Sequence, residues 1–399
     1  MTMRIGIDAT PLPERPVGAG AYIIHLVQAL AQECQDAAAR IDSAGSSPER
    51  IELVVIVQQS RRELFSVPAE APVEWVVVSD KSPARRLVWE QTVLPWLARR
   101  CRLDLLHSLH YTRPLVLPCR SVVTFHDMTF FMFPELHVRS KRVFFPLAMR
   151  ASARLADALI ADSETTRLDA MCILNIPPQR ITTVPLGIQE LFRPVGEMPG
   201  SLEERASQVE SCRQRYLLPS EFILFVGLVE PRKNLPLLVQ AYARLARQGD
   251  LPDLVIVGRM GWMYETVLEQ IAALGLKDRV RFTGYVPTKD LAIIYNLASV
   301  FVYPSLYEGF GFPPLEAMAC GTPTITTDVS SMREFAGQAC LLTPPQDEAA
   351  LAAAIRRLLD EPQLQARLSG LGRIQAARYT WKRTAQETLK IYQQVLEES

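Results

Sequence analysis

Residues 300–316 read VFVYPSLYEGFGFPPLE, and this stretch decides the fold class. It begins with a short, continuous apolar run, which is typical of a strand buried on both faces of a parallel sheet. A loop with Gly309 and Gly311 follows. Pro313 and Pro314 then open a helix, as proline does at a first turn. A strand, a glycine-containing loop and a helix in this order form the repeating unit of an α/β fold.

The same alternation continues through the second half of the chain, where short apolar runs are separated by longer amphipathic runs. Crossover helices supply a 3.6-residue period between buried parallel strands. We predict strands at residues 222–227, 254–258, 280–283, 300–303 and 324–326. We predict helices at residues 234–247, 264–273, 288–296 and 314–320. This order predicts a doubly wound parallel sheet.

The first half of the chain repeats the pattern. We predict strands at residues 4–8, 52–57, 74–78, 103–107, 121–125, 158–161 and 181–184. We predict helices at residues 19–32, 83–100, 140–155 and 164–174. Residues 35–50 are rich in Ala, Ser and Asp, and we predict that they form a mobile loop.

The chain has 399 residues, which is enough for two domains. Residues 193–200 (RPVGEMPG) are rich in proline and glycine and are predicted to be a linker. We therefore expect two Rossmann-like domains, residues 1–195 and 196–380, that face a cleft. Ligands of such sheets bind beyond the carboxyl ends of the strands, so functional residues are expected in the loops that follow the strands.

The composition is that of an ordinary soluble globular protein, with 48% hydrophobic and 22% charged residues. The formal net charge is zero, so no overall field favours binding to nucleic acid. The seven cysteines are odd in number and include no C-x-x-C pair, which argues against a disulfide framework or structural zinc. The sequence shows neither a signal-peptide core nor an apolar stretch of the about 18 residues that span a membrane. We therefore expect a cytoplasmic protein, or one peripheral to a membrane at most.

Two carboxylates frame the loop that follows residues 300–303. Glu308 lies in the loop, and Glu316 lies on the expected first turn of the next helix, so both could face one site. A carboxylate can accept hydrogen bonds from two sugar hydroxyls, whereas a buried carboxylate without a polar partner is costly. The alternative for Glu316 is that it caps its helix, which would leave Glu308 and the glycines unexplained.

Arg232 and Lys233 follow the strand at residues 222–227 and precede the helix at 234–247. Cations at a helix N-terminus oppose the helix dipole, so they need another reason to be there. A bound diphosphate supplies one, because arginine is a forked donor and lysine a point charge for phosphate oxygens. The alternative is a solvated basic loop.

Gly18, Ala19 and Gly20 follow the first strand and open a helix. Small residues there let backbone N–H groups approach an anion. The dinucleotide fingerprint is incomplete, because its third glycine and the acidic residue that holds the ribose are missing. Phosphate contact and a plain turn both remain open.

His126 follows the strand at residues 121–125 and is expected to project into the cleft, where it can bond a sugar hydroxyl or a developing charge. The alternative is an interior histidine bonded to a backbone carbonyl. His107 and His110, near the end of the previous strand, are rival candidates. The three histidines lack a ligand spacing such as H-E-x-x-H, so we expect no metal site.

Residues 81–150 are locally basic, with twelve lysine and arginine residues against four acidic residues. Within them, residues 85–100 (RRLVWEQTVLPWLARR) carry Trp89 and Trp96 among the cations and fit an amphipathic surface helix. We expect this face to meet anionic lipid or a lipid-linked diphosphate acceptor. A core helix with solvated arginines is the alternative.

The E-x7-E pair Glu308 and Glu316, within EGFGFPPLEAMACGTPTI, resembles the signature of glycosyltransferase family 4, also called group 1 glycosyl transferases. The resemblance extends through VGLVEPRKNL, LVIVGR, VRFTGYVP, IGIDATPL and VVTFHD, and so covers nearly the whole chain. The segments IGIDA, HSLHY and EPRKN are most similar to the mannosyltransferase-B-like branch of polysaccharide assembly. The resemblance implies a GT-B fold in which residues 381–399 form a helix that packs back on the N-terminal domain.

The resemblance also implies a nucleotide-sugar donor in the C-terminal domain, an acceptor in the N-terminal domain, and retention of the anomeric configuration without a metal or bound cofactor. Arg232 and Lys233 would hold the diphosphate, and Glu316 the ribose. Glu308, with the N–H groups of Phe310 and Gly311, would hold the donor sugar, and His126 would bond that sugar near its reacting end. The implied donor-binding residues are Gly18, Ala19, Gly20, Arg232, Lys233, Glu308, Gly309, Phe310, Gly311, Leu315 and Glu316.

One position departs from the family pattern: Leu228 stands where many members have an arginine, and Arg232 would take its place. Branch resemblance favours GDP-mannose as the donor and a glycan or lipid-linked acceptor. The alternatives are a transferase that uses a UDP-sugar, a sugar-nucleotide epimerase of GT-B type, and a carbohydrate-binding module without activity.

Overall fold

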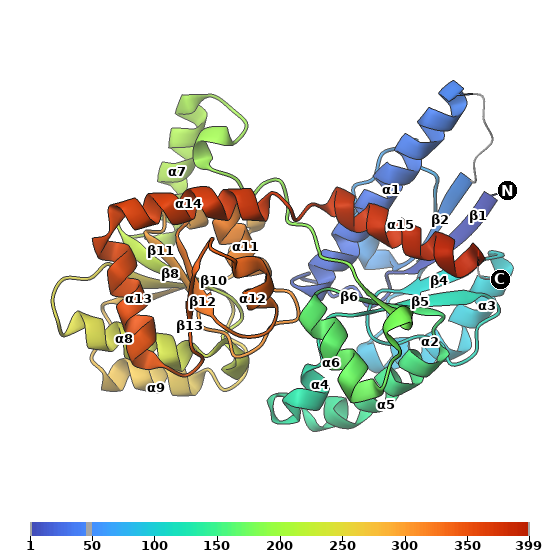
Figure 1. Ribbon diagram of the computed structural model, residues 1–399. Helices are drawn as coiled ribbons and strands as arrows, with labels where there is room; N and C mark the ends of the chain where they lie inside the picture. The colour runs from blue at the N-terminus through green and yellow to red at the C-terminus, as the bar shows by residue number, and fades with distance from the viewer. Residues whose placement is uncertain (1, 45–49, 398–399) are drawn as a thin grey trace. The chain divides into compact units, whose positions relative to one another are not determined.

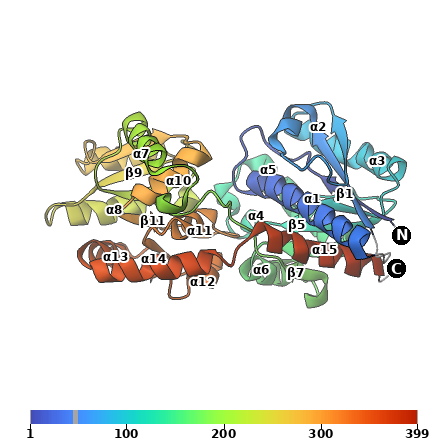
Figure 2. The same cartoon turned by 90° about the horizontal axis from the view of Figure 1, so that it is seen from above.

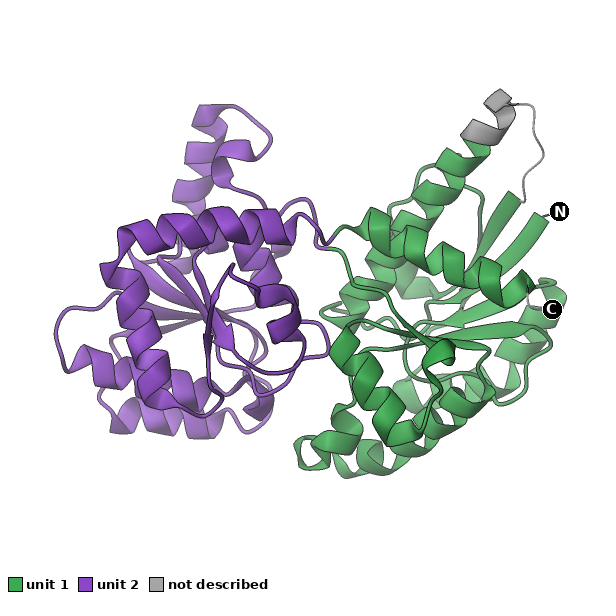
Figure 3. Cartoon of the chain, in the orientation of Figure 1, with its two compact units in different colours: residues 1–187, 380–399 green, residues 188–379 purple. Residues whose placement is uncertain are grey.

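The computed structural model describes residues 2–44 and 50–397. The chain forms two compact units, which are residues 1–187 with 380–399 (unit 1) and residues 188–379 (unit 2) (Figures 1 and 3). Each unit contains one parallel sheet covered by helices (Figures 1 and 2). This arrangement confirms the predicted class of two doubly wound α/β domains.

The sheet of unit 1 has seven strands in the order β3-β2-β1-β4-β5-β6-β7, and all neighbours pair in parallel. The strands are β1 (Thr2–Asp8), β2 (Arg50–Gln58), β3 (Val73–Val78), β4 (Leu105–Ser108), β5 (Arg120–Phe125), β6 (Ala158–Ala161) and β7 (Ile181–Thr183). The central residues of β1, β2, β4, β5 and β6 are mostly buried, so these strands show as apolar runs, whereas β3 is only half-buried.

The sheet of unit 2 has six parallel strands in the order β10-β9-β8-β11-β12-β13. The strands are β8 (Phe222–Val226), β9 (Asp253–Val257), β10 (Val280–Gly284), β11 (Val300–Tyr303), β12 (Thr324–Thr327) and β13 (Leu341–Thr343). The strand β13 was not predicted from the sequence.

Helices of unit 1 are α1 (Ala19–Ala44), α2 (Pro83–Thr92), α3 (Leu94–Arg100), α4 (Thr129–Met132), α5 (Arg139–Leu155), α6 (Glu164–Leu174) and α15 (Trp381–Glu397). Helices of unit 2 are α7 (Leu202–Tyr216), α8 (Leu235–Ala246), α9 (Glu265–Ala273), α10 (Thr288–Leu297), α11 (Phe312–Ala319), α12 (Ser330–Ala336), α13 (Glu348–Asp360) and α14 (Pro362–Ala376). The sequence prediction missed α4, α7, α12, α13 and α14. Of these, α7 carries a capping box between Ser201 and Glu204, a local signal that could have located it.

Two predictions about helices in unit 1 were wrong. The expected loop at residues 35–50 is helical as far as Ala44, because its alanine-rich start favours continuation of α1. Residues 45–49 lie outside the described part of the chain. The expected single helix at residues 83–100 is two helices, because Pro95 has no N–H to bond the preceding turn and instead lies at the start of α3.

The C-terminal helix α15 belongs to unit 1, where it lies beside α1 (Figures 1 and 2). The Thr384 hydroxyl donates to the carbonyl of Pro185 (2.8 Å), and the Tyr392 hydroxyl lies 2.6 Å from Nδ1 of His107. Gly187 lies where α15 begins, and a Cβ atom there would fall 2.1 Å from the backbone nitrogen of Trp381. Only glycine allows the two segments to approach so closely.

The proline- and glycine-rich residues 193–200 lie within unit 2. The side chain of Asn296 holds them, since its oxygen accepts from the Val195 N–H (2.8 Å) and its amide donates to the Arg193 carbonyl (3.0 Å). The units divide at Gly187/Ile188 and at Tyr379/Thr380, whereas the sequence analysis placed the boundaries at residues 195 and 380. In the described ranges, no helix is both long and apolar enough to span a membrane.

Candidate functional site

In unit 2, two loops meet at the carboxyl ends of β8 and β11, which are neighbours in the sheet. The loop after β8 contains a short 3-10 helix (Pro231–Lys233), and the loop after β11 leads through Glu308 into α11. The loops are joined through their backbones, because the N–H of Leu306 donates to the carbonyl of Arg232 (2.9 Å). This pairing brings the predicted cations and the predicted loop carboxylate together.

Glu308 is buried between the two cations. Its Oε2 lies 2.8 Å from Arg232, and its Oε1 lies 2.6 Å from Nζ of Lys233. The hydroxyls of Tyr303 (3.0 Å) and Ser305 (2.6 Å) also donate to Oε1. Burial raises the pKa of Glu308, but the charges of Arg232 and Lys233 outweigh it and lower the pKa to about 2. Glu308 is therefore an anion at any physiological pH.

Lys233 is as buried as its carboxylate partner. Its ammonium group donates to the Tyr303 hydroxyl (2.5 Å), so Tyr303 bridges Lys233 and Glu308. Burial and the neighbouring charge of Arg232 lower the pKa of Lys233, whereas Glu308 opposes that shift. Tyr303 was not singled out in the sequence, because a tyrosine within an apolar strand looks like a core residue.

Arg232 is bonded on both sides of its guanidinium group. One nitrogen contacts Glu230 (2.9 Å), and another donates to the carbonyl of Tyr307 (2.7 Å). Glu230, Arg232, Lys233 and Glu308 thus balance two positive and two negative charges in a small, poorly solvated volume. Such a balance is needed because an unpaired buried charge is very costly. The solvated basic loop that was the alternative for Arg232 and Lys233 does not describe this arrangement.

Glu316 lies in a different position from the one expected. The helix α11 begins at Phe312 after Gly311, whose φ of 98° is left-handed, so Glu316 lies in the second turn. The prediction that Glu316 lies on the first turn, where it could cap the helix, was wrong. Its Oε2 accepts from the hydroxyl of Tyr295 (3.0 Å). Burial raises the pKa of Glu316 to about 7, because Tyr295 offsets the lost solvation only in part.

Ser330 and Ser331, the first two residues of α12, form hydrogen bonds with the backbone of residues 308–310. The Ser331 hydroxyl donates to the carbonyls of Glu308 (2.9 Å) and Phe310 (2.7 Å), and the Glu308 N–H donates to the Ser330 hydroxyl (2.9 Å). Neither serine was predicted from the sequence. Gly309 lies within this braced loop, and Leu315 is fully buried in α11. These hydrogen bonds brace the loop at both ends.

In unit 1, His126 follows β5 and is buried, with both ring nitrogens occupied. Its Nδ1 lies 2.7 Å from Oδ2 of Asp162, and its Nε2 lies 2.9 Å from the carbonyl of Leu109. A carbonyl can only accept, so Nε2 carries a proton. Burial lowers the pKa of His126, but the charge of Asp162 outweighs it and raises the pKa. The bond to a backbone carbonyl matches the alternative of an interior histidine, and the sequence analysis missed Asp162.

The rival histidines are neutral at physiological pH; His107 is buried and His110 is half-buried. His107 bridges Tyr392 and the Thr124 hydroxyl (2.8 Å), and burial lowers its pKa to about 3. His110 lies with its ring centre 5.5 Å from that of His126, and burial lowers its pKa well below the usual value. Among the described residues, no group of three or more His, Cys, Asp or Glu is placed to hold a metal ion.

Gly18 and Gly20 flank the first residue of α1, and the two positions differ in the space that a side chain would have. Gly18 has a left-handed φ of 52°, and a Cβ atom added there would meet no other atom within 4 Å. At Gly20 a Cβ would lie 3.0 Å from Pro16 and 3.1 Å from Pro13. Local packing alone therefore explains Gly20, whereas Gly18 leaves space beside Ala19, the first residue of the helix.

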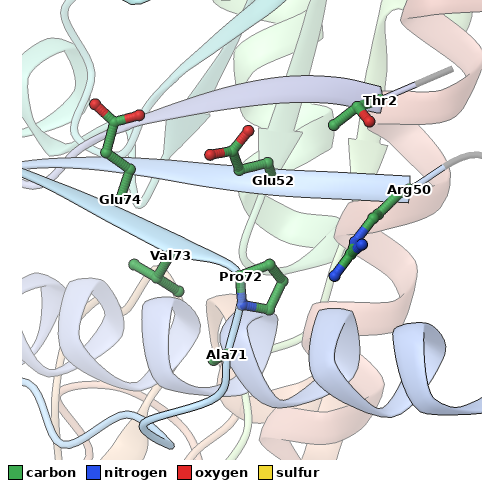
Figure 4. A pocket seen from close by; sticks show the side chains of 7 residues that line it. All are labelled: Thr2, Arg50, Glu52, Ala71, Pro72, Val73 and Glu74. Atoms are coloured by element: carbon green, nitrogen blue, oxygen red, sulfur yellow. The ribbon is translucent and has the colours of Figure 1, made fainter.

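One cavity of about 490 Å³ lies at the amino ends of β1, β2 and β3, the edge of the sheet opposite to His126 (Figure 4). Its lining residues are Thr2, Arg50, Glu52, Ala71, Pro72, Val73 and Glu74. The two carboxylates in the cavity, Glu52 and Glu74, both form ion pairs with Arg4, each at 2.5 Å. None of the predicted site residues lines this cavity.

Comparison with known proteins identifies the family. The profile of Glycosyl transferases group 1 matches residues 212–374, and that of Glycosyltransferase Family 4 matches residues 17–190. The O-antigen chain mannosyltransferase B of Escherichia coli is 31% identical over 300 residues, which cover 74% of this chain and 76% of that protein.

Solved structures share the fold. Sucrose-phosphate synthase from Thermosynechococcus elongatus superposes with a TM-score of 0.74 at 22% identity, over 100% of both chains. Anabaena HepE in complex with UDP and glucose superposes with a TM-score of 0.70 at 19% identity, over 98% of this chain and 100% of that chain. The chain therefore has the GT-B fold and belongs to glycosyltransferase family 4, the group 1 glycosyl transferases, as a hexosyltransferase.

Proposed function

We propose that this enzyme is a retaining glycosyltransferase that moves mannose from GDP-mannose to a glycan or lipid-linked acceptor in surface polysaccharide assembly, at the cytoplasmic side of the membrane and without a metal ion. The observation that carries the proposal is the cluster of half-buried Arg232 with buried Lys233 and Glu308 at the carboxyl edge of the unit 2 sheet. Likeness to an O-antigen chain mannosyltransferase supports the choice of sugar and pathway.

The donor would bind in unit 2. Arg232 and Lys233 are suited to a diphosphate, because a forked donor and a point charge lie side by side at a strand end. Glu308 carries the acceptor oxygens that sugar hydroxyls need, next to the backbone of Gly309, Phe310 and Gly311. Glu316, at a separate position on α11, would accept hydrogen bonds from the ribose, with Leu315 packed behind it.

The chemical step would rely on fixed charge. The bond between the sugar C1 and the diphosphate oxygen breaks, and the acceptor oxygen bonds C1 on the same face. The acceptor hydroxyl's proton passes to the departing phosphate. Arg232 and Lys233 would stabilise the negative charge that grows on this phosphate, a role that a metal ion fills in other enzymes. Glu308 holds both cations at this strand end, and Tyr303 also bonds Lys233.

Unit 1 would bind the acceptor and supply His126. The pairing with Asp162 favours the charged imidazolium, which can stabilise negative charge near the reacting end of the donor sugar. A hydrogen bond from His126 to the sugar would require Nε2 to leave the carbonyl of Leu109. Gly18, Ala19 and Gly20 would approach the phosphate with backbone N–H groups.

A panel of nucleotide sugars tests the proposal. Purified enzyme, with and without glycan acceptors, is incubated with GDP-mannose, UDP-glucose and other donors, and release of the nucleoside diphosphate is measured. We expect GDP-mannose to be turned over fastest and the product to keep the donor's anomeric configuration by NMR. Inversion, or no turnover of GDP-mannose, contradicts the proposal.

Two alternative functions predict different results in the same assay. A UDP-sugar transferase would prefer a UDP donor; the solved HepE complex contains UDP and glucose. An epimerase of GT-B type would form product with no acceptor present. A binding module without activity would have no use for buried diphosphate-binding cations, and calorimetry that detects no nucleoside diphosphate binding would favour it.

A further inference from the structure

The strand order of each sheet reverses at one point. In unit 2 the chain winds from β8 through β9 to β10 on one side and continues from β11 to β13 on the other, so the reversal lies between β8 and β11. Arg232, Lys233 and Glu308 lie at the carboxyl ends of these two strands. In unit 1 the corresponding reversal lies between β1 and β4. Since ligands of doubly wound sheets bind at such a point, we expect unit 1 to carry a ligand site of its own there.

The last residues of β1 and β4 carry buried polar atoms. Asp8 and Ser108 are register partners in the parallel pair, so they lie side by side. Both residues are only 1% exposed, and in the described ranges neither Oδ2 of Asp8 nor Oγ of Ser108 has a hydrogen-bond partner. Nη1 of Arg86 lies 3.9 Å from this Oδ2 but only 2.8 Å from Glu90. Buried polar atoms are normally bonded, and proteins depart from that rule mainly at functional sites.

His110 lies two residues beyond the end of β4 and is half-buried. Across the described parts of the chain, no hydrogen bond joins its ring to another residue. The rings of Tyr111, His126 and Phe145 surround it, with ring centres 4.6, 5.5 and 6.2 Å away. Burial, together with the charges of neighbouring basic groups, lowers the pKa of His110 well below its usual value. The ring is therefore neutral, with one nitrogen that donates and one that accepts.

The turn that carries His110 is strained and held from two sides. Tyr111 has a left-handed φ of 55°, a costly conformation for a residue with a large side chain. Its N–H donates to the carbonyl of Thr124 (3.0 Å). On the other side, Nε2 of His126 donates to the carbonyl of Leu109 (2.9 Å). Strain of this kind is typical of ligand-binding positions, where the surrounding structure imposes it.

The state of its ring nitrogens distinguishes His110 from the other two histidines near this edge. Both nitrogens of His107 and both nitrogens of His126 are bonded within unit 1. A substrate that reached either of these rings would have to replace an existing hydrogen bond, whereas a bond to His110 would replace none with another residue. His110 is thus the histidine best placed to gain a hydrogen bond from a ligand.

We propose that His110 binds the acceptor of the transfer reaction by exchanging hydrogen bonds with hydroxyls of its terminal sugar. One ring nitrogen would accept from a hydroxyl, and the other would donate to a neighbouring one. The half-buried ring of Phe145 offers an apolar surface beside these polar groups, a combination that is usual in small-ligand sites. A neutral ring suits a hydroxyl better than a phosphate, which favours a cation.

The inference deepens the proposed function and rests on it for the reaction itself, the transfer of a sugar to a glycan. The two can fail separately. An enzyme that consumes no GDP-mannose, with or without an acceptor, contradicts the proposed function and the role of His110 with it. An enzyme that transfers mannose equally well with and without the His110 ring contradicts the role of His110 alone.

Consumption of GDP-mannose by the full chain tests the inference, with the methyl glycosides of mannose, glucose and N-acetylglucosamine as acceptor probes. At least one glycoside should accelerate GDP release by the parent protein above its slow hydrolysis of the donor. His110→Leu should raise the KM for that glycoside at least about tenfold, because the hydrogen bonds to its hydroxyls are lost. Hydrolysis without a glycoside and the affinity for GDP should stay unchanged. His110→Gln keeps a donor and an acceptor and should lose less.

His25→Leu, at another half-buried histidine of unit 1, is the matched control and should behave as the parent protein does. Three results would overturn the proposal. The first is that no glycoside accelerates GDP release by the parent protein, and the second is that His110→Leu keeps the parent's KM. The third is that His110→Leu loses hydrolysis and melting temperature together with transfer, which would make the residue structural.

NMR of the parent protein gives an independent measurement if His110→Leu does not fold. The ring protons of His110 are assigned by their loss in His110→Gln. With GDP present, addition of the accelerating glycoside should shift these signals, and unshifted signals at a saturating concentration of glycoside contradict the contact.

Discussion

The ammonium group of Lys233 lies 2.6 Å from Oε1 of Glu308, and both side chains are buried. Each group therefore satisfies the other's charge while no donor is bound. In the proposed function, the same Lys233 binds phosphate and the same Glu308 binds sugar hydroxyls. Donor binding would then exchange an internal ion pair for two contacts with the ligand. Variants of Lys233 and Glu308 should therefore affect phosphate binding and sugar binding differently.

Glu308→Gln should have opposite effects on nucleoside diphosphate binding and on turnover of the nucleotide sugar. Without its carboxylate, Arg232 and Lys233 lose a competitor for phosphate, so nucleoside diphosphate alone should bind more tightly, by about tenfold or roughly 1.4 kcal/mol. Turnover of the nucleotide sugar should fall at the same time. Calorimetry measures the first effect, with Glu316→Gln as the control that gains no affinity. Weaker diphosphate binding in Glu308→Gln would show that the ion pair does not compete with the ligand.

Lys233→Ala should lower turnover at saturating donor, by about 100-fold, because the lost interaction strengthens as charge develops on the leaving phosphate. Initial rates over a range of donor concentrations give kcat and KM separately. Lys277→Ala, at an exposed lysine of unit 2, is the matched control and should leave both unchanged. A change in donor affinity alone would place Lys233 outside the reacting region.

Glu316→Gln should act mainly on the donor's KM, raising it about tenfold, since a ribose contact is made equally in the ground and transition states. If Glu316→Gln removes turnover instead, the assignment to the ribose is wrong. A lowered melting temperature with unchanged kinetics would make its contact with Tyr295 purely structural.

The raised pKa of Glu316 also predicts a pH dependence of stability. A carboxyl group whose folded pKa is about 7, above its usual 4.5, stabilises the fold below pH 4.5 and loses that contribution as the pH rises to 7. Between pH 5 and 8, the melting temperature of the parent protein should therefore fall more steeply than that of Glu316→Gln. If the melting temperatures of the two proteins fall equally steeply with pH over this range, the pKa of Glu316 is not raised.

Asp162→Asn should lower the pKa of His126 below 6.5, because burial then acts without the opposing carboxylate charge. NMR titration of the histidine ring protons measures this directly. The raised pKa in the parent protein stabilises the fold below about pH 6.5, and this stabilisation is lost as the pH rises through the folded pKa. Asp127→Asn is the control and should shift the pKa much less. An unchanged His126 pKa in Asp162→Asn would mean that the pair carries no net charge interaction.

Several features of the fold were predictable because their signals are local. Strands such as β8 and β11 are buried on both faces, so FILFV and VFVY show as apolar runs without any tertiary information. The position of functional loops at strand ends follows from the same pattern. The strand β13 and the proline break before α3 were not predicted from the sequence.

Two parallel α/β units, the family and the residue types at each strand end could be predicted, because continuous apolar runs and motif spacing are properties of residues that are neighbours in sequence. Which charges meet depends on the fold of the whole unit. Glu308 lies 75 positions from Lys233 and Asp162 lies 36 positions from His126, so no local period could pair them. Burial likewise separated Arg86, which is paired inside unit 1, from the exposed cations of α5, because the free energy of a charge depends on neighbours that only folding brings together.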